Sequence, residues 1–317
     1  MRNKIAIIGA GNVGATCAQR ILERELADVA LVDVVDGVAA GKALDLAQAA
    51  PLENHDGKIV GSTTYEIVEG AQVVVVTAGL ARKPGMSRSD LLEANAKIIQ
   101  SIIPQVVARA PQSILIMVTN PLDIMTYCAW RLSGFPAERV MGMAGVLDSA
   151  RFRTFAAQKL QVSVKEVDAL VLGGHGDSMV PLPRYTTVSG VPITELLSTA
   201  DIQQLIQRTR DGGAEIVKLL KTGSAFYAPA SSAADMAEAI VRDQHRVLPA
   251  CVHLSGQYGL KDVFCGVPIR LGASGVEQII EVSLDANEKS ALQSSAKAVK
   301  EECAVVDNFL KAVHAAS

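Results

Sequence analysis

The sequence predicts an α/β fold, in which an N-terminal doubly wound parallel sheet is followed by an α+β domain. Before Gly145, short unbroken apolar runs alternate with amphipathic stretches. Unbroken apolar runs are typical of strands buried on both faces, and the alternation indicates strand–helix–strand units. After Gly145 the helices and the antiparallel-type strands are grouped separately. We therefore expect two domains, residues 1–144 and residues 145–317.

The individual elements follow from this pattern in chain order. In the first domain we expect strands at Ile5–Ile8, Val29–Val32, Val73–Val76, Ile114–Val118 and Val140–Met143, and helices at 12–26, 37–50, 90–109 and 121–132. Asp90, with Glu93 three residues later, is the expected N-cap of the third helix. In the second domain we expect helices at 147–160, 199–221, 229–243 and 286–314, and strands at Ala169–Leu172, Val247–Leu254, Val263–Leu271 and Val276–Val282.

The composition excludes several classes of protein. Apolar residues make up 49% of the chain and the net charge is −3, so the sequence predicts a globular core without a basic stripe for nucleic acid. The apolar runs are too short to span a bilayer, so no membrane association is expected. The five cysteines have neither metal-ligand spacing nor a C-x-x-C pair. They predict reduced thiols, no bound metal and a cytoplasmic location.

A glycine-rich segment, Gly9-Ala10-Gly11-Asn12-Val13-Gly14, follows the first expected strand and opens the first expected helix. Glycines in this context let the backbone turn sharply and approach a pyrophosphate, which the helix N-terminus stabilises. Asp33 ends the second expected strand, at the usual place for a carboxylate that binds the adenosine ribose. Its neighbours Val34, Val35 and Asp36 offer no cation for a 2′-phosphate. The segment therefore predicts a Rossmann-type site for NAD rather than NADP.

Two polar segments follow the third and fourth expected strands. Arg82, Lys83 and Arg88 form a basic loop, and Val118-Thr119-Asn120-Pro121 forms a turn. Ligands of parallel sheets bind at the carboxyl ends of the strands, where both segments lie. Taken alone, each segment is also compatible with an ordinary surface loop or turn.

Two segments of the expected second domain carry acid/base and ion-pairing groups. Asp148 and Arg151 are three residues apart, so both project from one helix face, although a surface ion pair would have the same spacing. His175 lies among glycines in Gly173-Gly174-His175-Gly176-Asp177, which favours an imidazole that faces a cleft and moves a proton. A loop histidine without a role remains the alternative.

Together these motifs resemble the lactate/malate dehydrogenase family over essentially the whole chain. The later segments Lys221-Thr222-Gly223-Ser224-Ala225 and Gly256-Gln257-Tyr258-Gly259 resemble it too. The resemblance implies hydride transfer between NAD and a 2-hydroxy acid, with His175 as acid/base and Asp148 as its partner. It also implies a homodimer or homotetramer, and the malate-specific members of the family imply a role in the tricarboxylic acid cycle.

The resemblance further implies a set of binding residues. The substrate would contact Arg82, Arg88, Asn120 and Arg151, and NAD would contact Gly9, Ala10, Gly11, Asn12, Val13, Gly14, Asp33, Asn95, Val118, Thr119 and Asn120. We also expect a cis peptide at Asn120-Pro121, closure of the 80–90 loop over substrate, and a raised pKa of His175 beside Asp148.

Substrate choice depends on Arg82. Lactate-type relatives carry Gln at this place, and an arginine favours the second carboxylate of oxaloacetate and malate over the methyl group of pyruvate. An L-lactate dehydrogenase is the nearest alternative. A metal-dependent NAD glycosidase would resemble the same opening but carries Cys where this chain has Thr119. A non-catalytic NAD-binding protein would need no acid/base pair.

Overall fold

The computed structural model describes residues 2–80 and 87–314 of the chain. A nine-stranded sheet runs through the molecule in the order β14-β13-β12-β6-β5-β4-β1-β2-β3. The six strands β1 to β6 are all parallel, and their spatial order 3-2-1-4-5-6 is that of a doubly wound dinucleotide-binding sheet. Their bounds are β1 Lys4–Ile8, β2 Asp28–Val32, β3 Ile59–Ser62, β4 Val73–Val76, β5 Ile114–Met117 and β6 Val140–Gly142.

Helices of the first half connect these strands and cover the sheet. They are α1 Asn12–Glu23, α2 Val38–Glu53, α3 Arg88–Arg109 and α4 Leu122–Ser133. Strands β4 and β5 are completely buried, as their unbroken apolar sequences require. Each fully buried side chain of this kind contributes about 1.5–3 kcal/mol to the hydrophobic stabilisation. The expected parallel sheet is confirmed.

Strands of the second half extend the same sheet in antiparallel fashion. Strand β12 (Arg246–Ser255) pairs with β6 through Cys251 and Gly142, and it is followed outward by β13 (Lys261–Gly272) and β14 (Gly275–Ile279). The central sheet is therefore continuous across residues 144 and 145. Two small sheets use β7 Val167–Asp168, β8 Val171–Leu172, β9 Val180–Pro181, β10 Thr187–Val188 and β11 Val191–Pro192.

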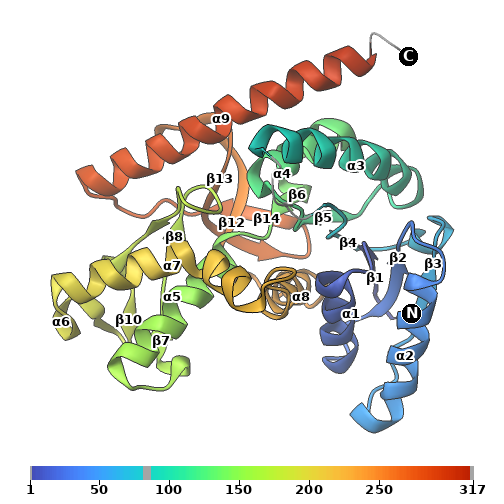
Figure 1. The fold of residues 1–317 in the computed structure, drawn as a ribbon, viewed down its shortest axis with the longest axis horizontal. Helices are drawn as coiled ribbons and strands as arrows, with labels where there is room; N and C mark the ends of the chain where they lie inside the picture. The colour runs from blue at the N-terminus through green and yellow to red at the C-terminus, as the bar shows by residue number, and fades with distance from the viewer. Residues whose placement is uncertain (1, 81–86, 315–317) are drawn as a thin grey trace.

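The remaining helices surround the antiparallel part. They are α5 Gly145–Leu160, α6 Ile193–Leu196, α7 Thr199–Leu220, α8 Tyr227–Val241 and α9 Ala286–His314. Figure 1 shows β1–β3 with α1 and α2 on one side of the molecule and α5–α7 on the other, while α9 crosses the top above α3 and α4. Within the described residues, none of the helices has the length and apolar character that crossing a bilayer requires.

Three local expectations were wrong. The N-cap of α3 is Ser87, and Asp90 is the third helical residue, which completes a capping box with Ser87. Strand β3 was not expected, because it is short and only partly buried. Of the expected strand Ala169–Leu172, only Val171–Leu172 forms a strand, β8, while the separate strand β7 ends at Asp168 and belongs to another small sheet. The first error concerns a local choice between two capping residues, whereas the two others concern short strands whose pairing partners lie elsewhere in the chain.

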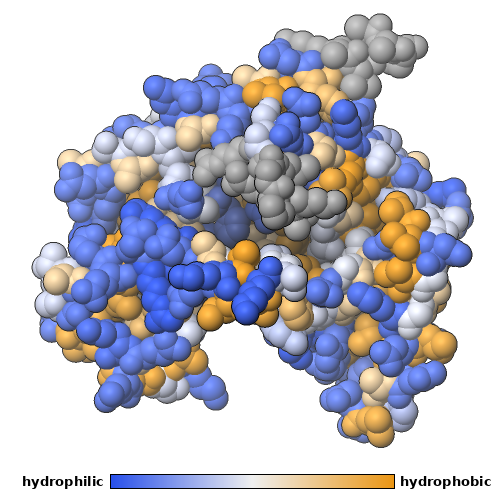
Figure 2. All heavy atoms as spheres, viewed as in Figure 1, coloured by the Kyte–Doolittle hydropathy of each residue, from blue (hydrophilic) through white to orange (hydrophobic). Residues whose placement is uncertain are grey.

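Apolar surface gathers over helix α2, at the lower right of Figure 2. Its Leu44 and Leu52 side chains are 61% and 85% exposed. Only two of its residues, Ala39 and Ala43, are buried. An apolar helix face of this kind is typical of a surface that contacts another protein chain.

Candidate active site

The glycine-rich segment forms a tight turn between β1 and α1. Gly9 has φ +105°, which favours glycine, and a Cβ there would lie 2.6 Å from the Ala78 nitrogen. A Cβ at Gly14 would overlap the Gly9 carbonyl oxygen, so this glycine lets α1 pack closely on the strand. At Gly11, by contrast, a Cβ would meet no atom within 4 Å. The backbone at Gly11 is therefore open to a ligand.

The N-terminus of α1 suits a phosphate group. Its N-cap is Gly11, no side chain caps it, and its first turn has no acidic residue. The free amides and the positive end of the helix dipole therefore remain available to an anion. These features fit the pyrophosphate of a dinucleotide.

Asp33 lies directly after β2, beside this turn. Its Oδ2 accepts a hydrogen bond from the Ala10 amide at 2.7 Å, and its Oδ1 accepts one from the Val35 amide at 3.0 Å. Lys42 of α2, which the sequence reasoning missed, donates to the Ala10 carbonyl oxygen at 2.7 Å. These bonds hold the Asp33 carboxylate beside the glycine-rich turn, where a ribose would be bound.

Asn95 of α3 joins the loops that follow β4 and β5. Its Nδ2 donates to the carbonyl oxygens of Leu80 at 3.1 Å and Asn120 at 2.6 Å, and its Oδ1 accepts from the Leu80 amide at 2.7 Å. Thr119 adds a hydrogen bond to the Ala78 carbonyl oxygen at 2.7 Å. The described contacts of Asn95 are therefore to the protein backbone, and its contact with NAD stays a prediction. The expected cis peptide at Asn120-Pro121 is confirmed.

His175 and Asp148 form a buried acid/base pair. The His175 Nδ1 lies 2.9 Å from the Asp148 Oδ2, and the two side chains are 14% and 3% exposed. Asp148 lies in the first turn of α5, whereas the loop of His175 is fixed by bonds between Gly173 and Gly266 and by the Ser295 hydroxyl, which accepts from the Gly174 amide. Such a pair can hold the imidazole in one orientation while its other nitrogen exchanges a proton.

Arg151 completes this cluster from the same face of α5. Its Nη1 lies 3.4 Å from the Asp148 Oδ1. Two glycines in the middle of α7 make room for it, because Cβ atoms at Gly212 and Gly213 would lie 3.1 Å from its Cδ and 3.5 Å from its Nη2. Burial lowers the pKa of Arg151 and Asp148 raises it again, but a guanidinium remains a cation in either case.

The electrostatics of the cluster favour the protonated histidine. Burial lowers the pKa of His175, but the charge and hydrogen bond of Asp148 and the charge of Asp123 outweigh it, against a smaller opposing effect of Arg151. The net direction is a raised pKa, as the sequence predicts. Asp123, which sequence reasoning missed, accepts a hydrogen bond from the His175 amide at 2.8 Å. Its position in the turn after Asn120-Pro121 was the available signal.

Two expected substrate ligands are not described. Arg82 lies outside the described residues, and so does most of the 80–90 loop whose closure was expected. Arg88 begins α3, but its side chain is not described either. Their roles stay predictions.

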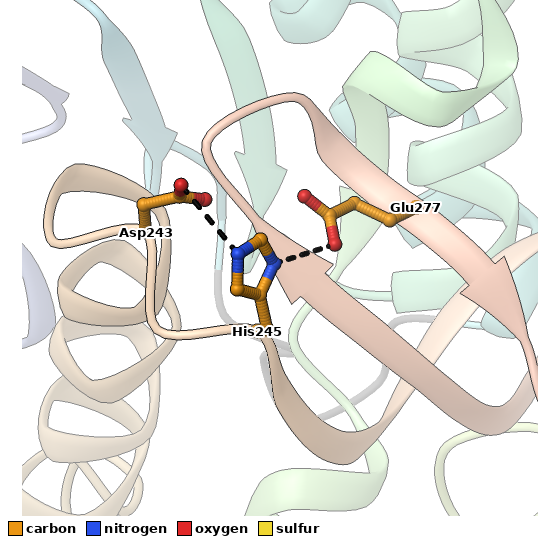
Figure 3. Close-up of side chains that lie close together, drawn as sticks. All are labelled: Asp243, His245 and Glu277. Carbon is orange, nitrogen blue, oxygen red and sulfur yellow. Dashed lines mark hydrogen bonds and ion pairs between the residues drawn. The ribbon is translucent and has the colours of Figure 1, made fainter.

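Among the residues the structure describes, a separate group of three side chains that could bind a metal ion lies at the β14 edge of the sheet (Figure 3). His245 faces Glu277 with Nδ1 at 2.8 Å and Asp243 with Nε2 at 3.6 Å, so its two ring nitrogens are directed at different carboxylates (Figure 3). Arg270 also lies 3.1 Å from the Glu277 Oε2. These side chains already form ion pairs with one another. We therefore interpret the cluster as a structural contact that connects the turn between α8 and β12 to β14.

Comparisons with known proteins agree with this geometry. The model of the lactate/malate dehydrogenase NAD binding domain matches residues 3–142, and that of the family's alpha/beta C-terminal domain matches residues 145–310. The chain is 56% identical to a malate dehydrogenase of Chloroherpeton thalassium over 97% of this chain and 100% of the relative.

Two solved structures have the same fold over nearly the whole chain. One is an apo malate dehydrogenase of Picrophilus torridus, with a TM-score of 0.96 and 47% identity over 98% of this chain and 99% of that one. The other is a lactate dehydrogenase of Cryptosporidium parvum in complex with lactic acid and NAD, with a TM-score of 0.94 and 40% identity over 97% and 99%.

Fold and site together define an NAD-dependent oxidoreductase. The open turn at Gly11, the uncapped N-terminus of α1 and the carboxylate of Asp33 fit this cofactor. More particularly, the chain belongs to the lactate/malate dehydrogenase family.

Proposed function

We propose that this protein is a malate dehydrogenase, which oxidises (S)-malate to oxaloacetate and catalyses the reverse reaction. NAD supplies the hydride acceptor when it is bound. The observation that carries the proposal is the buried cluster of His175, Asp148 and Arg151. The similarity of nearly the whole chain to a malate dehydrogenase, at 56% identity, supports it. The cluster offers a base, a group that orients it, and a cation for a carboxylate.

His175 removes the hydroxyl proton of malate and returns it during oxaloacetate reduction. Asp148 accepts a hydrogen bond from the imidazole Nδ1, which leaves Nε2 for the substrate and stabilises the imidazolium form. Arg151 presents a planar guanidinium to the carboxylate beside the reacting carbon. Arg88 stabilises the charge that develops on the carbonyl oxygen, and Asn120 contacts both substrate and cofactor.

The carboxyl ends of the parallel strands would hold NAD. The segment of residues 9–14 would hold its pyrophosphate, and Asp33 would bind its adenosine ribose. Asn95 and the turn that includes Val118, Thr119 and Asn120 would hold its nicotinamide end. Residues 1–144 form the cofactor domain and residues 145–317 the catalytic domain, although the two share one sheet.

Initial rates of NADH oxidation with oxaloacetate and with pyruvate test this proposal. We expect rapid oxidation with oxaloacetate and a much smaller kcat/KM with pyruvate. A preference for pyruvate would favour an L-lactate dehydrogenase instead. That alternative is worth testing because a solved lactate dehydrogenase shares the fold of this chain. NADH binding without turnover of either substrate would favour a non-catalytic binding protein.

Arg82 tests substrate choice directly. Arg82→Gln removes a charge-assisted hydrogen bond to the distal carboxylate, worth about 1.5–3 kcal/mol, and relieves pyruvate of an unpaired buried cation. The ratio of kcat/KM for oxaloacetate to that for pyruvate should therefore fall by more than about tenfold. A smaller change would mean that another group, first of all Lys83, binds the distal carboxylate.

The enzyme acts in the cytoplasm as a homodimer or homotetramer and serves the tricarboxylic acid cycle. The five cysteines are free and buried, which fits a reducing compartment. The apolar face of α2, with Leu44 and Leu52 exposed, offers a surface for a second copy. Light scattering during gel filtration tests the assembly, and a monomer at micromolar concentration would contradict it.

A further inference from the structure

Asp123 is a buried carboxyl group that the proposed reaction has not yet used. It lies in the first turn of α4 and is 3% exposed. Its Oδ2 accepts the His175 amide hydrogen at 2.8 Å, and its Oδ1 has no hydrogen-bond partner of ordinary geometry among the described residues, so the Cys251 thiol is the other polar neighbour of the carboxyl group. A buried carboxyl group with an unsatisfied oxygen is costly, so its presence calls for an explanation.

The position of Asp123 connects two parts of the active site. It comes three residues after Asn120, whose cis peptide with Pro121 leads from β5 into α4. Its carboxyl group reaches 52 residues along the chain to the main chain of His175. The segment between β5 and the first turn of α4 therefore carries both Asn120, which the proposed function assigns to the cofactor, and the carboxyl group that binds the main chain of the histidine.

Asp123 also acts on the histidine through its charge. Together with Asp148 it raises the pKa of His175. The pKa of Asp123 is itself raised, first of all by burial and also by the charge of Asp148. The Cys251 thiol, the His175 amide and the charge of His175 oppose this rise and favour the ionised carboxylate. Each carboxylate thus favours the imidazolium, and the imidazolium in turn reduces the repulsion between the two carboxylates.

The groups that face this carboxyl come from four elements and one loop. Cys251 lies on β12, Cys265 on β13 and Cys303 on α9, and the pKa of each thiol is raised first by burial and then by the charge of Asp123. The charged groups are Asp148 of α5 and His175 of its loop. The raised pKa values keep the three thiols neutral, so within the described part of the chain the charged groups that act on Asp123 are those of the acid/base pair.

We propose that Asp123 is a positioning residue, which fixes the main chain of His175 from the cofactor side and stabilises the imidazolium together with Asp148. The proposal rests on the proposed function in assigning proton transfer to His175. It differs from the role of Asp148, because Asp123 acts on the main chain and through space, whereas Asp148 contacts the ring.

The central test compares Asp123→Asn with Asp123→Ala. Asn removes the charge and keeps an oxygen that can accept the His175 amide hydrogen, whereas Ala removes both. We expect kcat for oxaloacetate reduction to fall roughly tenfold in Asp123→Asn, with the KM for NADH unchanged, and to fall further in Asp123→Ala. The alkaline limb of the pH profile should move to lower pH in both variants. A wild-type profile in Asp123→Asn would overturn the electrostatic part, and equal kcat values in the two variants would overturn the main-chain part.

A second pair of variants tests the charge without touching Asp123. Cys251→Ala removes the neighbouring thiol that favours the carboxylate, whereas Cys251→Ser keeps a donor. The alkaline limb should move to lower pH in Cys251→Ala and stay in place in Cys251→Ser. Equal profiles in both variants and the wild type would contradict the proposal, even if Asp123→Asn fails to fold.

The pKa of His175, followed by NMR of its imidazole protons, separates this proposal from the proposed function. It should be lower in Asp123→Asn than in the wild type, whether or not the enzyme turns over. If the wild type reduced neither oxaloacetate nor pyruvate, the proposed function would fail while this titration still decided the role of Asp123. An unchanged pKa in an active, folded variant would overturn the electrostatic role alone.

Discussion

Asp148→Asn removes the charge that faces the ring of His175 and leaves the shape of the side chain nearly unchanged. In the wild type the two groups are 2.9 Å apart and the carboxylate is only 3% exposed, so water screens the interaction weakly. A charge-assisted hydrogen bond contributes about 1.5–3 kcal/mol, and about 1.4 kcal/mol corresponds to a tenfold change in rate. We therefore expect kcat/KM for oxaloacetate reduction to fall about 10- to 150-fold.

The pH profile gives the sign of this effect. Because the pKa of His175 is raised, the protonated form needed for oxaloacetate reduction persists to higher pH than in free histidine. Malate oxidation needs the neutral form and is therefore lost as pH falls through the same pKa. Without the charge of Asp148 this pKa falls, so the alkaline limb of reduction and the acidic limb of oxidation should both move to lower pH.

The assay is the initial rate of NADH oxidation over a range of pH, with NADH saturating. Asp168→Asn is a matched control, because Asp168 lies exposed on β7 and should leave both the rate and the profile unchanged. If Asp148→Asn lowered the rate while the position of both limbs stayed at the wild-type pH, Asp148 would not stabilise the imidazolium. The reasoning from charge and burial would then be refuted.

Two further predictions use pairs of neighbouring glycines. Gly14→Ala introduces a Cβ that overlaps a backbone oxygen, so Tm should fall by several degrees, whereas at Gly11 the Cβ meets nothing within 4 Å. Gly11→Ala should therefore keep its Tm. It should bind NADH at least about tenfold more weakly in a fluorescence titration, because the backbone at this position approaches the pyrophosphate. An unchanged affinity for NADH would contradict this prediction. Gly212→Ala places a Cβ 3.1 Å from the Arg151 Cδ and should raise the KM for oxaloacetate, whereas Gly213→Ala, 3.5 Å from Nη2, should keep that KM. Gly213→Ala should also raise the free energy of unfolding by about 1 kcal/mol, since Ala is the better helix former, and equal KM values in the two variants would show that Arg151 is not held by this contact.

Much of the fold could be predicted because its signals are local. The unbroken apolar sequence of β4 requires burial on both faces, and the glycines at positions 9 and 14 require a turn against which a helix packs closely. The segment of residues 286–314 has the length and apolar period of a helix, and α9 has the expected bounds. Such features depend on backbone sterics and side-chain period, which neighbouring residues determine.

The errors lie in one local choice and in pairings between distant segments. Asp90 has the composition of an N-cap, but Ser87 was equally suitable, and only the position of the preceding backbone decided between them. The strands after residue 245 were expected, but their extension of the first sheet was not, because the pairing of β12 with β6 joins residues far apart in the sequence. A strand pattern states that a segment is buried, and it does not name the partner.

The sequence by itself determined the glycine-rich turn between β1 and α1 and the pairing of Asp148 with Arg151 three residues later. Only the tertiary structure decided that His175 faces Asp148, that Asp123 holds its main chain, and that Lys42 reaches the carbonyl oxygen of Ala10. The reason is physical. Helix period and turn sterics act over a few residues, whereas these three contacts join separate elements and depend on how the whole sheet and its helices pack.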